Sequence, residues 1–406
     1  MQAFVLRWVI IGITFLGLLP AYGQEGVIIL PGISRNQAVV TSISFESSRP
    51  ELKLLGQRAF TLHGGFKLVG TRDASYALRM EPIGPTSVQL IIKELVNGNG
   101  KIIITERLEG SDLNAAFLKA CDRAVFEISG KPGFFSGKLA FIGKRRGVSE
   151  IYTSDIFFRS VRPLTADRAL VTGPSWSPDG SQLLYTTYFK SGFPDIYLMD
   201  FKKGVRQPVA SYKGTNTGGR FSPDGKSIAM VISGGADTEI CVSDALGKGL
   251  KSLTRNKSLE SGPSWSPDGK RLVYTSDARG KPQLYMMSAT GGQSRRIPTQ
   301  ISGFCTEPTW NPSDSNLIAF TASVGGSFQV CIYDFKLGKT QIVTKVSGSA
   351  VEPTWLNDGR HLIFTHRSGA RTTVTLLDTK TGQTHALHRA GFGSSSSASF
   401  VYPALR

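Results

Sequence analysis

A string of seven residues recurs along the chain at an almost fixed spacing. PSWSPDG at 174–180 returns as GRFSPDG from Gly219, as PSWSPDG from Pro263, as PTWNPSD from Pro308 and as PTWLNDG from Pro353. The third position of every copy is aromatic, and we call it the aromatic slot. At intervals of 45, 44, 45 and 45 residues, the slot holds Trp176, Phe221, Trp265, Trp310 and Trp355. Such a period is typical of a repeat protein.

The hydrophobic pattern inside each period is that of β-strands. An alternating run follows the Asp-Gly pair, as at 183–187 and 271–275, and leads to a Gly-rich turn. A second run ends in aspartate, as at 196–200 and 330–334, and a third, weaker run precedes the next copy. Four short antiparallel strands in about 45 residues form one blade of a β-propeller.

The two ends of the repeat array complement each other. Residues 138–165 read as a blade without its aromatic strand, with 139–142 and 150–154 as its next two strands. Phe400, in ASFVYPAL, lies 45 residues beyond Trp355 and supplies that missing strand. Pairing the C-terminal strand with the first blade closes the ring and removes its open edges. The 269 residues of 138–406 make about six units, so we predict a mainly β fold with a six-bladed propeller.

The repeated residues themselves are expected to serve architecture. Pro followed by Asp-Gly favours a turn, and an aromatic residue in every blade favours packing between blades. A motif present in all blades does not distinguish one blade from another. We therefore expect function at positions where the blades differ, on the loops and around the central channel.

The first 23 residues have the pattern of a secretory signal peptide. Arg7 precedes an apolar run at 8–19, and Ala21-Tyr22-Gly23 provides small residues before an expected cleavage after Gly23. Twelve apolar residues are short of the roughly 20 that span a bilayer, and an uncleaved anchor is the alternative. We predict an exported, periplasmic protein that is not embedded in the membrane after cleavage.

Residues 24–136 follow a different pattern and are predicted to form a separate small α/β domain. Strands are expected at 38–44 and 87–95, with a hairpin partner at 101–108. One helix is expected to open at Ser48 and Pro50 and to stop before Gly64-Gly65. A second is expected to be capped by Ser111 and ended by Gly130.

Read together, these features resemble the TolB family of the Tol-Pal cell-envelope system. The resemblance rests on the PSWSPDG copies, TEPTW at 306–310, YTSDARGKPQLY at 274–285 and the SGKPGFFSGKLAFI junction at 129–142. The closing strand ASFVYPAL is similar to the family's last strand but lacks its tryptophan. The resemblance implies a periplasmic, non-catalytic adaptor that supports outer-membrane integrity and envelope constriction during division.

The resemblance also implies two partners. The channel mouth of the propeller would bind a Pal-like peptidoglycan-associated lipoprotein, and the start of the mature chain would bind the C-terminal domain of TolA. That N-terminal segment is EGVIIL, and an ordinary edge strand is the alternative reading of it. Its partner-binding residues would be Glu25, Val27, Ile28, Ile29 and Leu30.

The channel mouth can also be located from the repeat itself. The innermost strand of each blade lines the channel, so residues just before the aromatic slot lie at one rim, beside the loops joining second and third strands. The predicted rim residues are Thr172, Thr217, Ser261, Thr306, Glu307 and Glu352. The predicted basic collar consists of Lys144, Arg145, Arg146, Lys190, Arg279, Lys281, Arg367 and Arg371. Such a surface favours an acidic partner and salt-sensitive binding, unless it is only the solvated face of a chain with net charge +17.

Other functions are less compatible with the sequence. Export and the lack of a recognition motif argue against nucleic acid, despite a pI near 9.8. No G-x-S-x-G motif is present, and we predict no catalytic residue, metal or cofactor. An exported propeller enzyme with channel histidines, or an envelope-polysaccharide-binding protein, is the alternative. Cys305 and Cys331 share a blade neighbourhood, and whether they form a disulfide stays open; the chain is expected to be a monomer.

Overall fold

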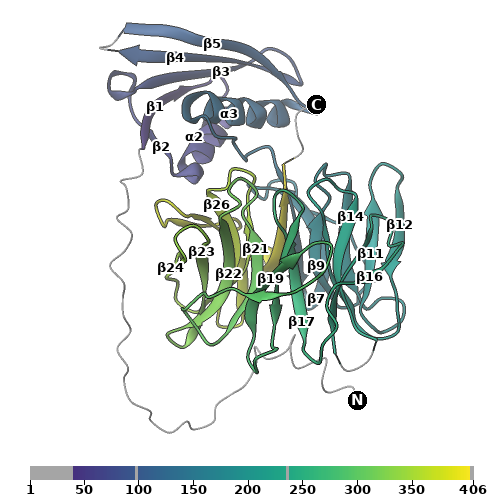
Figure 1. Ribbon diagram of the computed structural model, residues 1–406. Coiled ribbons are helices and arrows are strands. Elements are labelled where there is room, and N and C mark those ends of the chain that lie inside the picture. The colour runs from purple at the N-terminus through teal and green to yellow at the C-terminus, as the bar shows by residue number, and fades with distance from the viewer. Residues whose placement is uncertain (1–39, 97–98, 235–236, 403–406) are drawn as a thin grey trace. The chain divides into compact units, whose positions relative to one another are not determined.

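The structure, a computed structural model shown in Figure 1, describes residues 40–96, 99–234 and 237–402. The predicted signal peptide and the segment from Glu25 to Leu30 lie outside the described residues. Two architectures follow each other along the chain: a five-stranded sheet with two α-helices, and then six four-stranded sheets. The predicted fold class, a six-bladed β-propeller preceded by a small α/β domain, is confirmed.

The α/β domain has a mixed sheet in the order β2-β1-β3-β4-β5. The strand β1 runs parallel to both of its neighbours, and the other pairs are antiparallel. Its elements are β1 (Thr41–Glu46), α2 (Pro50–His63), β2 (Phe66–Leu68), the 3-10 turn η1 (Thr71–Asp73), β3 (Tyr76–Pro82), β4 (Ser87–Val96), β5 (Asn99–Glu109) and α3 (Leu113–Ser129).

The helix ends in this domain follow ordinary capping chemistry, with one correction. Gly64 and Gly130 end the two helices in the left-handed conformation, as predicted. The N-cap of α3 is Asp112, whose carboxylate accepts a hydrogen bond from the Ala115 backbone amide at 2.9 Å. The prediction of Ser111 as the cap was wrong, because its hydroxyl instead donates to Asp112.

Each propeller blade is an antiparallel sheet, and we number the blades in chain order. The inner strands of blades 1 to 6 are β29 (Ser394–Val401), β9 (Val171–Trp176), β13 (Asn216–Phe221), β17 (Glu260–Trp265), β21 (Cys305–Trp310) and β25 (Ser349–Trp355). The second strands are β6 (Lys138–Arg145), β10 (Gln182–Thr187), β14 (Ser227–Ile232), β18 (Arg271–Ser276), β22 (Leu317–Val324) and β26 (His361–Ser368).

The outermost strand is the shortest strand of the blade in every blade except blade 2, where β12 is as long as its neighbours. The third strands are β7 (Val148–Asp155), β11 (Asp195–Asp200), β15 (Glu239–Asp244), β19 (Gln283–Ser288), β23 (Ser327–Asp334) and β27 (Arg371–Asp378). The outer strands are β8 (Arg162–Pro163), β12 (Val205–Ala210), β16 (Lys251–Ser252), β20 (Arg295–Arg296), β24 (Lys339–Ile342) and β28 (Thr384–Ala386). A 3-10 turn, η2 (Ala390–Phe392), precedes β29.

Blade 1 combines the two ends of the propeller sequence. The C-terminal strand β29 pairs antiparallel with β6, and Phe400 lies opposite Leu139. Trp176 opposite Leu183 and Trp355 opposite Leu362 show the same register in other blades. Phe400 therefore occupies the aromatic slot of blade 1.

The aromatic slot joins neighbouring blades. Between blades 2 and 3, Phe221 packs in one apolar cluster with Leu184 and Ile196 of the preceding blade. The indole of Trp265 donates to the backbone carbonyl of Arg220 at 3.0 Å, again in the preceding blade. The repeated aromatic residues thus bury apolar surface and satisfy backbone groups between blades, which is an architectural role.

The α/β domain and blade 6 share a hydrophobic core. Phe60, Phe134 and Phe135 belong to the same buried cluster as Leu356 and Ile363. The connecting segment is held by Asp122 of α3, whose carboxylate accepts the amides of Phe135 at 2.7 Å and Ser136 at 2.9 Å. Burial raises the pKa of Asp122 to about 6 despite these bonds.

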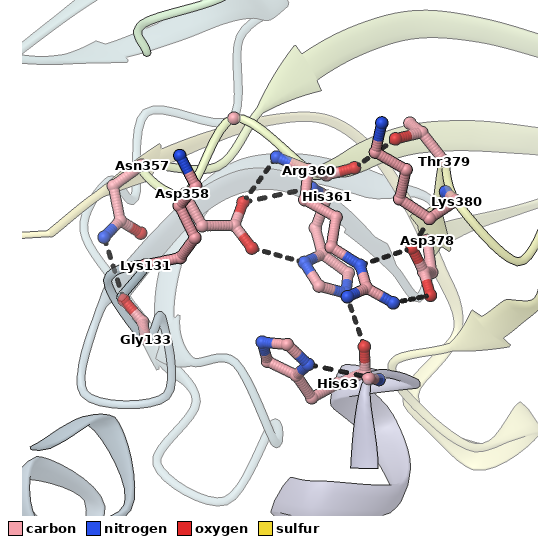
Figure 2. Close-up of polar contacts among 12 residues, drawn as sticks. His63, Lys131, Gly133, Asn357, Asp358, Arg360, His361, Asp378, Thr379 and Lys380 are labelled. Carbon is pink, nitrogen blue, oxygen red and sulfur yellow. Dashed lines mark hydrogen bonds and ion pairs between the residues drawn. The ribbon is translucent and has the colours of Figure 1, made fainter. Parts of the chain in front are cut away.

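A buried polar cluster lies at this junction (Figure 2). The His361 ring, fully buried in the turn region of blade 6, places Nδ1 2.5 Å from Asp358 Oδ2 and Nε2 2.8 Å from the backbone carbonyl of His63. Burial by itself would raise the pKa of Asp358, but the charge and hydrogen bonds of His361 hold it below its ordinary value. An ionised carboxylate and a carbonyl both only accept, so both ring nitrogens of His361 face hydrogen-bond acceptors.

Two more contacts surround this cluster in Figure 2. Arg360 makes a bidentate ion pair with Asp378, at 2.8 and 2.7 Å. Asn357 donates its side-chain amide to the Gly133 carbonyl at 2.8 Å, which ties the blade 6 turn to the segment that leaves α3. The junction is therefore both apolar and hydrogen-bonded.

Replacing His361 with alanine should destabilise the protein strongly. The variant leaves the Asp358 carboxylate buried without its partner, a change that costs about 3–5 kcal/mol of unfolding free energy. Urea unfolding at neutral pH measures the loss. The matched control is His366→Ala. Within the described residues the His366 ring has one hydrogen bond, to the Ser347 carbonyl near the surface, so this variant should cost about 1 kcal/mol or less. Equal losses from the two variants would contradict a stabilising role for the buried contact between Asp358 and His361.

Replacing His63 with phenylalanine should weaken the acid sensitivity of folding. Burial, and next the nearby His361, lower the pKa of His63 from 6.5 to about 3. Between these values the unfolded chain binds a proton that the native chain does not. His63 therefore lowers the free energy of unfolding as pH falls, by up to about 1.4 kcal/mol per pH unit. The phenylalanine ring would pack beside Phe66 and Phe134, which already contact His63.

The measurement is the unfolding free energy in urea between about pH 6 and about pH 4. The His63→Phe line should be shallower than the wild-type line. Parallel lines for the two proteins would show that His63 does not cause this acid sensitivity.

Candidate functional site

The inner strand of every blade contains a β-bulge three residues before the aromatic slot. The register between inner and second strands shifts at this point in all six blades. One residue of each bulge, which we call the bulge residue, has a left-handed backbone. From blade 2 onward to the closing strand, these residues are Gly173, Gly218, Gly262, Glu307, Glu352 and Ser397, with φ between 50° and 68°.

The occupants of this position divide the ring into two halves. Blades 2 to 4 have glycine, which adopts positive φ without a steric penalty. Blades 5, 6 and 1 have Glu307, Glu352 and Ser397, for which the same backbone is strained. A Cβ at Gly173 would meet nothing within 4 Å, so a side chain would have space there. The left-handed backbone conformation, and not a lack of space, is therefore what favours glycine at this position.

The first strained glutamate links blades 5 and 6. The carboxylate of Glu307 accepts the Thr321 hydroxyl at 2.7 Å, within its own blade. The same Oε2 accepts the backbone amide of Glu352 at 2.8 Å, in the next blade. Thr321 lies on the second strand and also contacts that amide.

The second glutamate repeats this arrangement one blade later. The Glu352 carboxylate accepts the Thr365 hydroxyl at 2.6 Å and the backbone amide of Ser397 at 3.0 Å. Its other oxygen lies 3.6 Å from the Arg367 guanidinium. Three consecutive bulges are therefore connected by two carboxylates, and we call Glu307, Glu352 and Ser397 the bulge ladder.

The two carboxylates differ in their surroundings. Burial, followed by the charge of Glu352, raises the pKa of Glu307, while bonds from Thr321 and the Glu352 amide act in the opposite direction. The Glu352 side chain keeps 26% of its surface exposed beside Arg367.

The structure places the predicted rim residues on the inner strands. Thr172, Thr217, Ser261 and Thr306 each precede a bulge residue, and all are at least partly exposed. The collar residues lie on the ends of second and third strands and on the loops between them. All are exposed except the half-buried Arg367, and Arg367 alone of the eight has an ion pair with a rim glutamate within the described residues.

Sequence reasoning missed three members of this site. Thr321 and Thr365 lie on second strands, where a threonine reads as an ordinary strand residue. Ser397 lies in the closing strand, where the lost tryptophan obscures the repeat. Aligning all copies on the aromatic slot would have found Ser397, because it occupies the position that holds glycine in three blades.

A set of possible metal ligands is found away from the mouth. One ligand atom each of His63, Asp358 and His361 lies within 4.8 Å of the others. Both nitrogens of His361 already face protein acceptors, so a cation would have to break the hydrogen bonds described above. The open question on cysteines is settled in the structure, where all four are free and buried. Burial raises the pKa of Cys331 to about 12.

The strain at Glu307 can be measured by comparing two substitutions. Glu307→Gly and Glu307→Ala both remove the carboxylate, but only glycine accepts the left-handed backbone freely. The glycine variant should be more stable than the alanine variant by about 1 kcal/mol in urea unfolding. At exposed Lys101 in β5 the order should reverse, because glycine weakens an extended strand. An alanine variant at 307 as stable as the glycine variant would refute the strain.

Comparison with known proteins supports the sequence resemblance. The family model described as PD40, TolB beta propeller domain, matches residues 126–305. The Tol-Pal system protein TolB of Bordetella pertussis is 31% identical over 174 residues, which cover 43% of this chain and 40% of that protein. The Bordetella parapertussis TolB matches equally, over 39% of its length. The match thus spans about 40% of the length of these curated relatives.

Solved structures support the fold. The crystal structure of TolB from Acinetobacter baumannii superposes with a TM-score of 0.77 at 21% identity, covering 89% of this chain and 96% of that one. A putative TolB from Agrobacterium tumefaciens gives 0.51 at 20% identity, covering 62% and 88%. In the described part of the chain, no helix is both long and apolar enough to cross a bilayer. The predicted resemblance to TolB proteins is confirmed: residues 126–305 match the PD40 model, and the fold is that of the solved TolB structure.

Proposed function

We propose that this protein is a non-catalytic adaptor of the Tol-Pal cell-envelope system in the periplasm. Its propeller would bind a Pal-like lipoprotein at the channel mouth and so support outer-membrane integrity and constriction during division. The PD40 match and the curated relatives, which are named as Tol-Pal system proteins, support this assignment. The signal-peptide pattern before Gly23 supports export.

The bulge ladder is the observation that carries the proposed binding site. Three of six equivalent positions keep Glu307, Glu352 and Ser397 in a backbone that glycine adopts more easily. Strained residues persist where the surrounding structure holds them and often where a ligand binds. The two carboxylates bond threonine hydroxyls and backbone amides, so their positions are fixed before a partner arrives. Such preorganisation lowers the entropy cost of binding.

The basic collar would act on the rate of encounter. Seven exposed lysines and arginines surround the mouth, together with Arg367 beside Glu352. The positive charge of the basic collar attracts an acidic partner over about 10 Å at moderate salt, and added salt screens this attraction. The partner's basic or hydroxyl groups would then meet the glutamates inside. This division predicts that collar substitutions change association rates and that rim substitutions change dissociation rates.

The segment Glu25, Val27, Ile28, Ile29 and Leu30 would bind the C-terminal domain of TolA. Its support is the sequence pattern alone, because the segment lies outside the described residues. An alternating apolar strand suits addition to the edge of a partner's sheet. Calorimetry with that domain, comparing Ile29→Asp with wild type, tests it: equal binding by both proteins would remove the segment from the interface.

The proposed mouth is tested by titrating the mature chain, from Gln24, with the periplasmic domain of the same organism's Pal-like lipoprotein. We expect micromolar or tighter binding that weakens at high salt. Glu307→Gly and Glu352→Gly keep a backbone that blades 2 to 4 already use, so they remove the carboxylates with little strain. Each should weaken binding about tenfold or more, as expected for a buried hydrogen-bonded charge.

The matched control is Glu51→Gln, an exposed carboxylate on α2, which should leave the affinity unchanged. Unaltered affinity in both glycine variants would exclude the bulge ladder from the interface. An absence of binding at either salt concentration would refute the Pal-like partner itself.

A further inference from the structure

A second set of equivalent positions lies nearer the other end of the inner strands. Each residue of this set stands one position before the aromatic slot, whereas the bulge residue stands three positions before it. Five of the six residues there carry a small hydroxyl side chain. The sixth, in blade 3, is an arginine. The set, in blade order from blade 1, is Ser399, Ser175, Arg220, Ser264, Thr309 and Thr354. One blade therefore places a long cationic side chain where the other blades have a short neutral one.

Arg220 has no acidic partner in the described residues. Its Nη1 donates to the backbone carbonyls of Gly173 at 3.3 Å and Gly219 at 3.2 Å. No carboxylate of the described chain lies within ion-pair distance, and its remaining guanidinium donors have no protein acceptor there. Burial lowers the pKa of Arg220, and Glu352 opposes this from a distance. A guanidinium stays charged in proteins, so the positive charge is uncompensated at close range.

Arg220 lines a pocket of about 350 Å³ at this end of the strands. The walls include Trp265 and Trp310 from the aromatic slot and the prolines Pro223 and Pro267 of the turns that follow it. Ser264 adds a hydroxyl. We call this space the turn-side pocket. Its volume and its largely apolar wall with few polar groups fit a small-molecule or single-residue ligand.

Two groups in the turn-side pocket can recognise an anion. The guanidinium of Arg220 has paired donors that match the two oxygens of a carboxylate. The Ser264 hydroxyl accepts the Trp310 amide at 3.0 Å, and in the described residues its own proton has no acceptor. Trp265 is the most exposed of the tryptophans in the slot, being partly buried where Trp176, Trp310 and Trp355 are buried. Part of its indole surface is therefore accessible to an apolar group of a ligand.

We propose that the turn-side pocket binds the free C-terminal residue of a peptide with an apolar side chain, its carboxylate on Arg220 and Ser264 and its side chain against Trp265 and the prolines. A single guanidinium compensates one negative charge, which suits a carboxylate better than a phosphate dianion. The Trp and Pro walls favour an apolar body over a sugar or a free inorganic ion. Capture of a chain terminus by a charged pocket is an established mode of peptide recognition.

This proposal is independent of the channel-mouth function. The rim residues open the inner strands, as Thr306 does in β21, whereas the turn-side pocket forms where the same strands end, as at Trp310. Arg220 bonds the carbonyl of the bulge residue Gly173, but in the described residues it makes no hydrogen bond or ion pair with Glu307 or Glu352, which the mouth test changes. Failure of either binding test therefore does not imply failure of the other.

The first test uses wild-type protein and two ligands that differ only in charge. Calorimetry compares N-acetyl-phenylalanine, which has a free carboxylate, with its uncharged amide. We expect the acid to bind at least about tenfold more tightly than the amide. Equal affinities, tighter binding of inorganic phosphate than of the acid, or no binding of either phenylalanine ligand would overturn the proposal.

The second test locates the site. Arg220→Gln should reduce the affinity for the acid to that of the amide, while Arg295→Gln, an exposed arginine on β20, should leave it unchanged. Ser264→Ala should lower the affinity for the acid by about two- to fivefold and the affinity for the amide by less. Circular dichroism checks folding; if Arg220→Gln does not fold, Ser264→Ala and the acid-amide comparison still decide. Undiminished binding of the acid in a folded Arg220→Gln protein would refute the site.

Discussion

The pairing of the C-terminal strand with the first blade is the interaction on which the rest of this structure depends. The strand β29 contributes six register pairs to β6 and leaves blade 1 with the same four-strand order as the others. Without it, blades 1 and 6 would each expose an open face to water, and the channel would have a gap. The ring is closed by segments that are far apart in sequence, so every blade packs against two neighbours. The ring is therefore cooperative, because no blade can unfold without breaking two interfaces.

Because the ring is closed, the same strand position can be compared in all six blades. A residue that differs from its equivalents in the other blades can then be recognised as an exception. An equivalent backbone places equivalent residues around one axis, so differences in side chain are differences in local chemistry. Glycine would suit every bulge, yet Glu307, Glu352 and Ser397 occupy three of them at the expense of backbone strain. A hydroxyl would suit every position before the slot, yet Arg220 occupies one. The architecture of the blades explains neither exception. The polar groups at these positions are therefore the candidates for contacts with a partner or a ligand.

Much of the fold was predictable because its signals are local and repeated. The aromatic slot, the Asp-Gly turns and the alternating runs each indicate strands, and their period indicates blades. The cap of α3 was misassigned because Ser111 and Asp112 are both good caps, and only the geometry shows that Asp112 meets the Ala115 amide. The first strand was placed from residue 38, whereas β1 begins at Thr41 within the described residues.

The candidate site was less predictable because its contacts cross blades. The sequence places Glu307 and Glu352 45 residues apart and near the rim, but not the bond from one carboxylate to the other's amide. That bond depends on the left-handed backbone of the bulge. A sequence indicates such a backbone only where the residue is glycine, and here it is glutamate. The junction shows the same limit. His63 and His361 are 298 positions apart, and only the packing of α2 on blade 6 brings the His361 ring to the His63 carbonyl.

The two exceptional sets of residues place unlike charges at different levels of the inner strands. Carboxylates in blades 5 and 6 lie on the rim side of the bulges, and a guanidinium in blade 3 lies two residues further along the strand, about 7 Å of strand rise away. Glu352 favours the charged form of Arg220 without a hydrogen bond or ion pair between them in the described residues. A ring of six similar blades would be electrically uniform. Unlike charges on different blades and at different levels make the ring electrically asymmetric, which favours one orientation of a partner with complementary charge.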